Sequence, residues 1–189
     1  MLHNNMQKLY FATGNKEKVK EAQAILQVPI EIVDIEIDEV QSMDLEYVAK
    51  RKAEEAFKIL QKPVITDDVG FKIEVWNGFP GPLVKHLLNS MGIRGLLKAI
   101  ENETNRGVIV QNAIGYHDGQ EAHVFIGEFR GTISAEERGK GGWGFDVVVI
   151  PEGEKLTLAE LGTIHKNKMS HRFKSLQILK EFLHNQNKK

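Results

Sequence analysis

Two adjacent carboxylates, Asp67 and Asp68, follow a short apolar run in the stretch PVITDDVGF. A core strand gains nothing from such charges, because an unpaired buried carboxylate costs several kcal/mol. We therefore expect the strand to end at this pair and a metal ion, a cation or water to meet it. Neighbouring strand residues point to opposite faces, so one carboxylate is expected to face a cleft and the pair is not expected to share a proton.

A carboxylate at the end of a strand is a hard oxygen ligand of the kind that Mg²⁺ prefers. Glu39, which follows the second apolar stretch of the chain, is the candidate for a second metal ligand beside Asp68. Taken alone, each of these acids is equally typical of a solvated turn.

The stretch TGNKEK, residues 13–18, predicts a strand that turns through Gly14 directly into a helix. Free backbone N–H groups and the positive end of the helix dipole favour an anion such as phosphate at this position. Thr13 and Asn15 can donate side-chain hydrogen bonds, and Lys18 can reach back by one turn. Considered by itself, Asn15 is more typical of a plain helix cap.

Two further stretches could hold the rest of a nucleotide. In GKGGWGFDVVV, Trp143 and Phe145 could stack on a base, or could equally be core aromatics, and Asp146 is expected to open the next strand. In HKNKMSHRF, the basic and polar side chains stand at the start of the last helix, where N–H groups are free. They are Lys166, Ser170, His171 and Arg172. Together, the four stretches supply sites for phosphates, Mg²⁺ and a base.

The composition sets limits on the class of protein. The 189 residues include 25 Lys and Arg against 26 Asp and Glu, a net charge of -1, so no global field favours nucleic acid or an anionic membrane. Disulfides and thiolate metal sites are excluded because the chain has no cysteine. No apolar run approaches the ~18 residues of a membrane span, and no signal peptide is evident. We expect a cytoplasmic protein with one domain, residues 1–189, in two lobes.

Hydrophobic periodicity predicts an α/β fold: a long central mixed β-sheet with flanking helices, and two lobes around an active-site cleft. The predicted strands are 8–13, 30–37, 64–66, 71–75, 107–116, 121–133 and 145–150. The predicted helices are 16–26, 44–60, 83–91, 93–102, a short one before 161, and a C-terminal one that carries Met169, Phe173, Leu176 and Leu183 on one face.

The chain resembles the inosine triphosphate pyrophosphatase family over nearly its whole length. The matching motifs come in family order and form a specific set. They are TGNKEK, Lys52–Ala53, Asp67–Asp68, GFPGP, GWGFD, TLAEL and KNKMSHR. The resemblance implies hydrolysis of ITP, dITP and XTP to the monophosphate and pyrophosphate with Mg²⁺, by a homodimer. From the net charge we expect no nucleic-acid or membrane partner.

The resemblance also implies roles for residues. Asp68 matches the general base and metal ligand, and Glu39 matches the other metal-associated acid. The positions that match substrate-binding residues are Thr13, Gly14, Asn15, Lys16, Glu17, Lys18, Lys52, Val69, Trp143, Gly144, Phe145, Asp146, Lys166, Ser170, His171 and Arg172. Donors from Lys166, Arg172 or the backbone beside His171 would pair with the C6 oxygen of hypoxanthine or xanthine.

Some positions depart from the family pattern. Val69 stands where a hydroxyl residue is usual, Val147 replaces a proline, Leu83 replaces a tyrosine, and His86 stands where one branch has tryptophan. These departures leave two alternatives open. One is a nucleotide-binding protein without turnover, and the other is a pyrophosphatase for other modified nucleotides. An RNA-binding module is disfavoured by the near-zero net charge.

Overall fold

The computed structural model of the chain describes residues 8–140, 142 and 144–186, without the side chains of 163–168. Its strands are β1 (Leu9–Ala12), β2 (Ile30–Val33), β3 (Val64–Ile73), β4 (Pro80–Gly81), β5 (Gly107–His117), β6 (Ala122–Ile133) and β7 (Val149–Pro151). Its helices are α1 (Lys16–Leu26), α2 (Leu45–Leu60), α3 (Val84–Ala99), α4 (Leu158–Met169) and α5 (His171–Gln186), with 3₁₀ turns at Glu74–Trp76 and Gly144–Val147.

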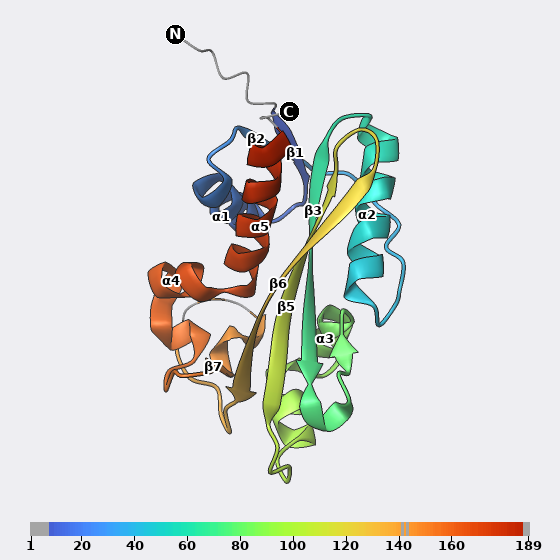
Figure 1. Cartoon of the computed structure of the whole chain (residues 1–189). Coiled ribbons are helices and arrows are strands. Elements are labelled where there is room, and N and C mark those ends of the chain that lie inside the picture. The colour runs from blue at the N-terminus through green and yellow to red at the C-terminus, as the bar shows by residue number, and fades with distance from the viewer. Residues whose placement is uncertain (1–7, 141, 143, 187–189) are drawn as a thin grey trace.

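The strands form one mixed sheet in the order β2-β1-β3-β5-β6-β7, and β4 pairs with the outer edge of β3. β1 runs parallel to β2 and β3, whereas β3, β5, β6 and β7 pair antiparallel. Figure 1 shows how the long strands β3, β5 and β6 run the length of the molecule and carry helices at both ends. The predicted α/β fold with a long mixed sheet and flanking helices is confirmed.

The expectation that a strand ends at the aspartate pair is wrong. β3 continues through Asp67 and Asp68, and each of its residues from Val64 to Ile73 is paired with β5. On its other edge, β3 pairs with β1 only at Val64 and Ile65 and with β4 only at Phe71 and Lys72. Among the described residues, the outer edge of β3 therefore has no strand partner between these two points, and the aspartates lie in that gap.

Other element boundaries also differ from the sequence-based expectation. β2 ends at Val33 rather than at Ile37, and the segment that follows crosses towards α2. Asp146 lies in the 3₁₀ turn Gly144–Val147, so it does not open β7, which begins at Val149. The two helices predicted on either side of residue 92 are confirmed, because α3 breaks at Gly92, whose φ of 67° favours glycine.

Two hydrophobic clusters occupy the two ends of the long strands. One surrounds Phe71, Leu96 and Phe145, and the other surrounds Phe11, Ile65 and Leu176. They form the cores of two lobes that share β3, β5 and β6, as predicted. That residues 1–189 act as a single domain stays a prediction. Among the described residues, no helix combines the length and apolarity that crossing a bilayer requires.

Two glycines let helices approach the shared strands closely. A Cβ at Gly115 of β5 would overlap the carbonyl oxygen of Ala49 in α2. A Cβ at Gly127 of β6 would overlap the carbonyl oxygen of His171 at the start of α5. Since the obstacles are backbone atoms, neither position can accept a larger residue without moving a helix.

We predict that Gly127→Ala destabilises the protein by about 1–3 kcal/mol, the usual cost of overpacking a close contact. Unfolding in urea, monitored by circular dichroism, measures this change. Gly14→Ala is the matched control, because a Cβ there meets only Asp34 Oδ1 at 3.7 Å. Equal stability of Gly127→Ala and the native chain would contradict the close approach of α5.

Candidate active site

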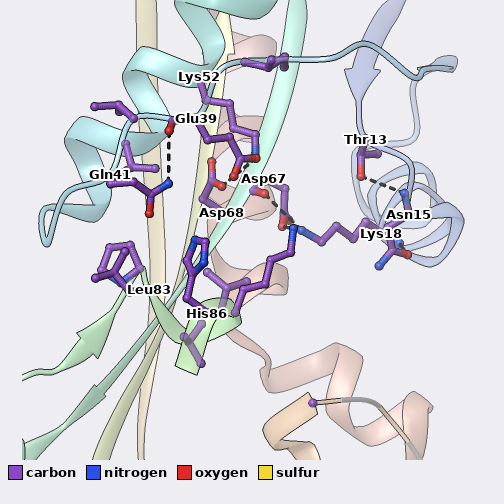
Figure 2. Close-up of a pocket in the computed structure, with 18 of the residues that line it drawn as sticks. Thr13, Asn15, Lys18, Glu39, Gln41, Lys52, Asp67, Asp68, Leu83 and His86 are labelled. Atoms are coloured by element: carbon purple, nitrogen blue, oxygen red, sulfur yellow. Dashed lines mark hydrogen bonds and ion pairs between the residues drawn. The ribbon is translucent and has the colours of Figure 1, made fainter. Parts of the chain in front are cut away.

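A cavity of about 700 Å³ opens beside the gap in the edge of β3 (Figure 2). Its walls come from the β1–α1 turn, the segment after β2, one side of α2, the middle of β3, the first turns of α3 and the turn at Gly144. Its volume lies within the range of ~300–1,000 Å³ that is typical of small-molecule sites. Each of these elements packs in one of the two lobes, so the lobes fix the positions of the walls.

Asp67 and Asp68 point to opposite faces of β3, as their positions in the sequence predict. The Asp67 carboxylate lies on the side of α1 and α5, where Lys18 pairs with its Oδ1 and Arg172 Nε donates to its Oδ2 at 2.7 Å. Arg172 Nη1 in turn donates to Glu21 Oε2 at 2.8 Å. The side chain of Asp67 is fully buried, so these cations are what make its charge tolerable.

Asp68 faces α2 and meets the other predicted metal ligand through a shared lysine. Lys52 Nζ lies 2.9 Å from Asp68 Oδ1 and 2.6 Å from Glu39 Oε1 (Figure 2). The two carboxylates thus converge on one cation. The second oxygen, Asp68 Oδ2, is buried and has no hydrogen-bond partner among the described residues.

The environments of the two aspartates shift their pKa values in opposite directions. Burial alone would raise the pKa of Asp67, but Arg172 and Lys18 outweigh it and hold that pKa well below its usual range. Burial raises the pKa of Asp68, and the single shared Lys52 does not fully compensate. Burial also opposes ionisation of Glu39, yet Lys52, with help from Lys85 and Lys18, lowers its pKa.

The cavity fits a magnesium ion bound by few protein ligands. Asp68 Oδ2 is an unpartnered hard oxygen, and Glu39 already shares a cation with the same residue. In the part of the chain that the structure describes, no cluster of three acidic or histidine side chains is found that could hold a metal alone. Mg²⁺ commonly takes one or two carboxylates and completes its shell with water and substrate phosphates.

The β1–α1 turn is built by its own side chains. Asn15 Oδ1 accepts from the N–H groups of Glu17 and Lys18 at 3.0 and 3.3 Å, and Thr13 Oγ1 accepts from Asn15 N at 3.1 Å. Asn15 is therefore the N-cap of α1, which was the simpler of the two interpretations. The cap orients the first turn so that the long side chain of Lys18 reaches Asp67 (Figure 2).

The structure brings many of the predicted site residues to the walls of the cavity. They are Thr13, Gly14, Asn15, Lys18, Glu39, Lys52, Asp68, Val69, Gly144 and Phe145. Lys16 and Glu17 are not among them: both are exposed, and Glu17 pairs with Lys20 at 2.7 Å. Trp143 and the side chain of Lys166 lie outside the described residues.

Four other predicted site residues are absent from the cavity wall: one lies in the Gly144–Val147 turn and three lie at the start of α5. Asp146, Ser170, His171 and Arg172 are between 2% and 4% exposed. Ser170 Oγ accepts from Phe173 N at 3.1 Å and so caps α5, while Arg172 is bound to Asp67 and Glu21. Direct contact of these four with a substrate stays a prediction.

Several wall residues were missed by reading the sequence. Gln41 and Ser42 come from the segment before α2, and Lys85, His86 and Asn89 come from the first turns of α3. Lys85 is close enough to help lower the pKa of Glu39 from across the cavity. The available signal was the polar Lys85–His86 pair, which is separated by three residues from the preceding Gly-Phe-Pro-Gly turn and lies inside an otherwise apolar helix start.

These features define a mixed α/β protein whose cleft carries paired acids and converging lysines. The chain belongs to the Ham1 family, whose sequence model matches residues 9–182. It is 42% identical over 182 residues to the dITP/XTP pyrophosphatase of Methanopyrus kandleri, covering 94% of this chain and 97% of that protein. It is 40% identical to the dITP/XTP pyrophosphatase of Hyperthermus butylicus, over 93% of this chain and 94% of that protein.

Solved structures agree with this assignment. A HAM1 protein from Coxiella burnetii superposes with a TM-score of 0.86 at 26% identity, covering 95% of this chain and all of that one (100%). The Ham1 protein of Staphylococcus aureus gives a TM-score of 0.84, also at 26% identity and with the same coverage of both chains.

We predict that Asp68→Asn stabilises the metal-free protein at pH 7 and has no such effect near pH 3. The pKa of Asp68 is higher in the folded than in the unfolded protein. The protonated carboxyl therefore stabilises the fold fully below the unfolded-state pKa, and this stabilisation is lost as the pH rises through the folded-state pKa. Removing the charge removes the cost of ionisation at pH 7. Urea unfolding of both proteins at the two pH values measures the difference.

Glu39→Gln is the matched control, with the opposite sign. The pKa of Glu39 is lowered in the fold, so its contribution is present above the unfolded pKa and is lost on acidification. Its side chain is 45% exposed, so only a small loss of stability is expected at pH 7. Destabilisation by both substitutions at pH 7 would contradict the raised pKa of Asp68.

Proposed function

We propose that the chain is a Mg²⁺-dependent pyrophosphatase that hydrolyses non-canonical purine nucleoside triphosphates, ITP, dITP and XTP, to the monophosphate and pyrophosphate. It would thereby remove these nucleotides from the cellular pool. The supporting observation is the pairing of Asp68 and Glu39 on one cation beside an unpartnered buried oxygen, inside a cavity rimmed by lysines. The relatives named dITP/XTP pyrophosphatase support the substrate class.

Asp68 is the proposed general base. Among the described residues its Oδ2 has no hydrogen-bond partner, so it can accept a proton without breaking an existing bond. Asp68 and Glu39 would hold the magnesium ion, which when bound neutralises phosphate charge and polarises phosphorus. Asp68 Oδ2 would orient the attacking water and take its proton.

The lysines would bind and stabilise the phosphates. Lys18 and Lys52 reach the cavity from α1 and α2, and Lys85 reaches it from α3 on the other lobe. Among the described residues, Lys18 and Lys52 are paired with carboxylates, whereas Lys85 has no ion-pair partner. Positive groups aimed at the leaving pyrophosphate lower the barrier where negative charge develops.

Base selection would rest on hydrogen-bond donors for the C6 oxygen of hypoxanthine and xanthine. Arg172 is already bound to two carboxylates, so in this proposal the donor is Lys166 or the backbone beside His171. Adenine presents an amino group there and would meet a donor. A polar pocket can reject such a mismatch by about 10⁴–10⁵.

The first test is a product assay with Mg²⁺ that compares ITP, XTP, dITP, ATP, GTP and dTTP. We expect monophosphate and pyrophosphate from ITP, dITP and XTP, with ATP nearly intact. Asp68→Asn is expected to lower kcat by about 10²–10⁴, the usual contribution of a general base. Asp44→Asn is the control, because asparagine caps a helix as well as the aspartate that now accepts from Tyr47 N.

Retention of most of the turnover in Asp68→Asn would disprove the assignment of the base. Tight binding of ITP without any product would instead support the alternative of a nucleotide-binding protein without turnover. Turnover of methylated or pyrimidine nucleotides in preference to ITP would support the second alternative.

The homodimer and the cytoplasmic location complete the proposal. Met43, Tyr47 and Phe79 are large apolar side chains that are 48%, 46% and 43% exposed, and we propose that a second subunit covers them. We expect light scattering of the purified protein to give twice the chain mass of 21.4 kDa. A monomer at micromolar concentration would refute this part.

A further inference from the structure

Asp67 has no chemical step in the proposed mechanism, yet it is the more elaborately bound of the two aspartates. Its side chain is fully buried in the middle of β3, and two helices converge on it: α1 through Lys18 and α5 through Arg172. Arg172 binds mainly one oxygen of the carboxylate, with Nε 2.7 Å from Oδ2 and Nη2 3.5 Å from Oδ1. Lys18 is the close partner of the other oxygen, so the buried carboxylate and the lysine hold each other in place.

The ammonium group of Lys18 contacts two acceptor atoms of Asp67. Its Nζ pairs with Asp67 Oδ1 and also donates to the backbone oxygen of Asp67 at 3.2 Å. An ammonium group has three donors, so these contacts fix its position and leave one donor for the cavity that Lys18 lines. A flexible lysine stem is thereby held in one geometry before any ligand arrives.

Asp67 does not fully neutralise Lys18, because its carboxylate also binds Arg172 on the side away from Lys18. Asp67, Lys18 and Arg172 together carry one net positive charge, and Glu21 lies on the far side, next to Arg172 Nη1. An aspartate that faced Lys18 alone would cancel its charge. With Glu21 counted, the four side chains are neutral, but Glu21 lies beyond Arg172, so Arg172 is the group that directly balances the carboxylate that positions the ammonium group.

We propose that Asp67 is a positioning residue for phosphate binding: it sets the Lys18 ammonium group at the cavity wall, and Arg172 holds Asp67 in place from behind. The proposal rests on the proposed function, in which Lys18 binds the triphosphate. The side chain of Asp67 is fully buried at the cavity wall, so its proposed role is not direct contact with the substrate. Its effect on the reaction passes through Lys18.

The test is a double-mutant cycle on ITP hydrolysis with Mg²⁺, using Asp67→Asn, Lys18→Met and the double variant. We expect each single change to lower kcat/KM by about tenfold to a hundredfold, mainly through KM, as for loss of one charge-assisted contact. In the Lys18→Met background, Asp67→Asn should have no further kinetic effect. Independent, multiplying effects on kcat/KM would overturn the proposal.

The variant Glu21→Gln tests whether the positioning of Lys18 by Asp67 is separate from the stability of the fold. Glu21 binds Arg172 in the same network and does not contact Lys18. It should lower the melting temperature and leave KM for ITP unchanged, whereas Asp67→Asn should change both. Equal kinetic effects of Glu21→Gln and Asp67→Asn would mean that Asp67 acts only as part of the structural network, which overturns the proposal.

Asp67→Glu decides the question if Asp67→Asn does not fold, because it keeps the charge and moves the carboxylate by one methylene. Binding of inorganic tripolyphosphate to each folded variant, measured by calorimetry, gives a readout that does not need turnover. Binding that is weakened to the level of Lys18→Met supports the proposal, and binding equal to that of the native chain overturns it. An inactive native chain that binds tripolyphosphate would refute the proposed function and leave this test intact.

Discussion

The burial of one charge, that of Asp67, governs how the helices meet the sheet. A carboxylate in the middle of a central strand is tolerated only if cations reach it, because the cost of an unpaired buried charge is severe. Arg172 reaches it from α5 and Lys18 reaches it from α1, so two helices from opposite ends of the chain are tied to one residue of β3. Glu21 and Arg172 then connect the two helices directly.

The close approach of α5 depends on small residues as well as on charge. Gly127 lets the first turn of α5 lie against β6, and Ser175 Oγ donates to Asn112 on β5 from the same helix. Asn112 Nδ2 in turn donates to the backbone oxygen of Asp68 at 3.1 Å. The backbone of the candidate base is therefore held by the same helix that supplies Arg172 to its neighbour.

The gap in the edge of β3 follows from how the chain enters and leaves this strand. β1 departs after Ala12 into the turn that caps α1, and β4 rejoins the edge only at Phe71 and Lys72. The lobes diverge at this point, so their walls enclose a cavity instead of a continued sheet. The aspartates occupy the stretch of the central strand that has β5 on one side and the cavity on the other.

The sequence predicted the parts of this arrangement that depend on local patterns. The alternation of helices and strands, the two long strands 107–116 and 121–133, the helix that starts near residue 44 and the opposed aspartates all follow from patterns along the chain. It failed at β3, where two charges suggested the end of a strand. The partners that stabilise them, Lys18 and Arg172, are 49 and 105 residues away from Asp67, and no local pattern reveals such pairings.

The same limit explains which site residues were missed or misplaced. Lys85 faces Glu39 only because α3 lies across the cavity from α2, which is a property of the two-lobed fold. Arg172 was expected in the base pocket because the family resemblance implies that role, and its direct contact with a substrate stays a prediction. Its burial beside Asp67 depends on how α5 docks on the sheet.

Adjacent aspartates on one strand can thus have separate tasks, because the two faces of a sheet are separate environments. On one face, two cations and full burial keep Asp67 ionised, so it serves as a fixed negative anchor for Lys18. On the other face, burial with a single shared lysine leaves Asp68 easier to protonate and leaves one of its oxygens unpartnered. A group that must take a proton from water needs the second environment, and a group that must never lose its charge needs the first. Because successive residues of β3 point to opposite faces, the two adjacent aspartates can hold the proposed phosphate-binding lysine and supply the proposed base at the same cavity.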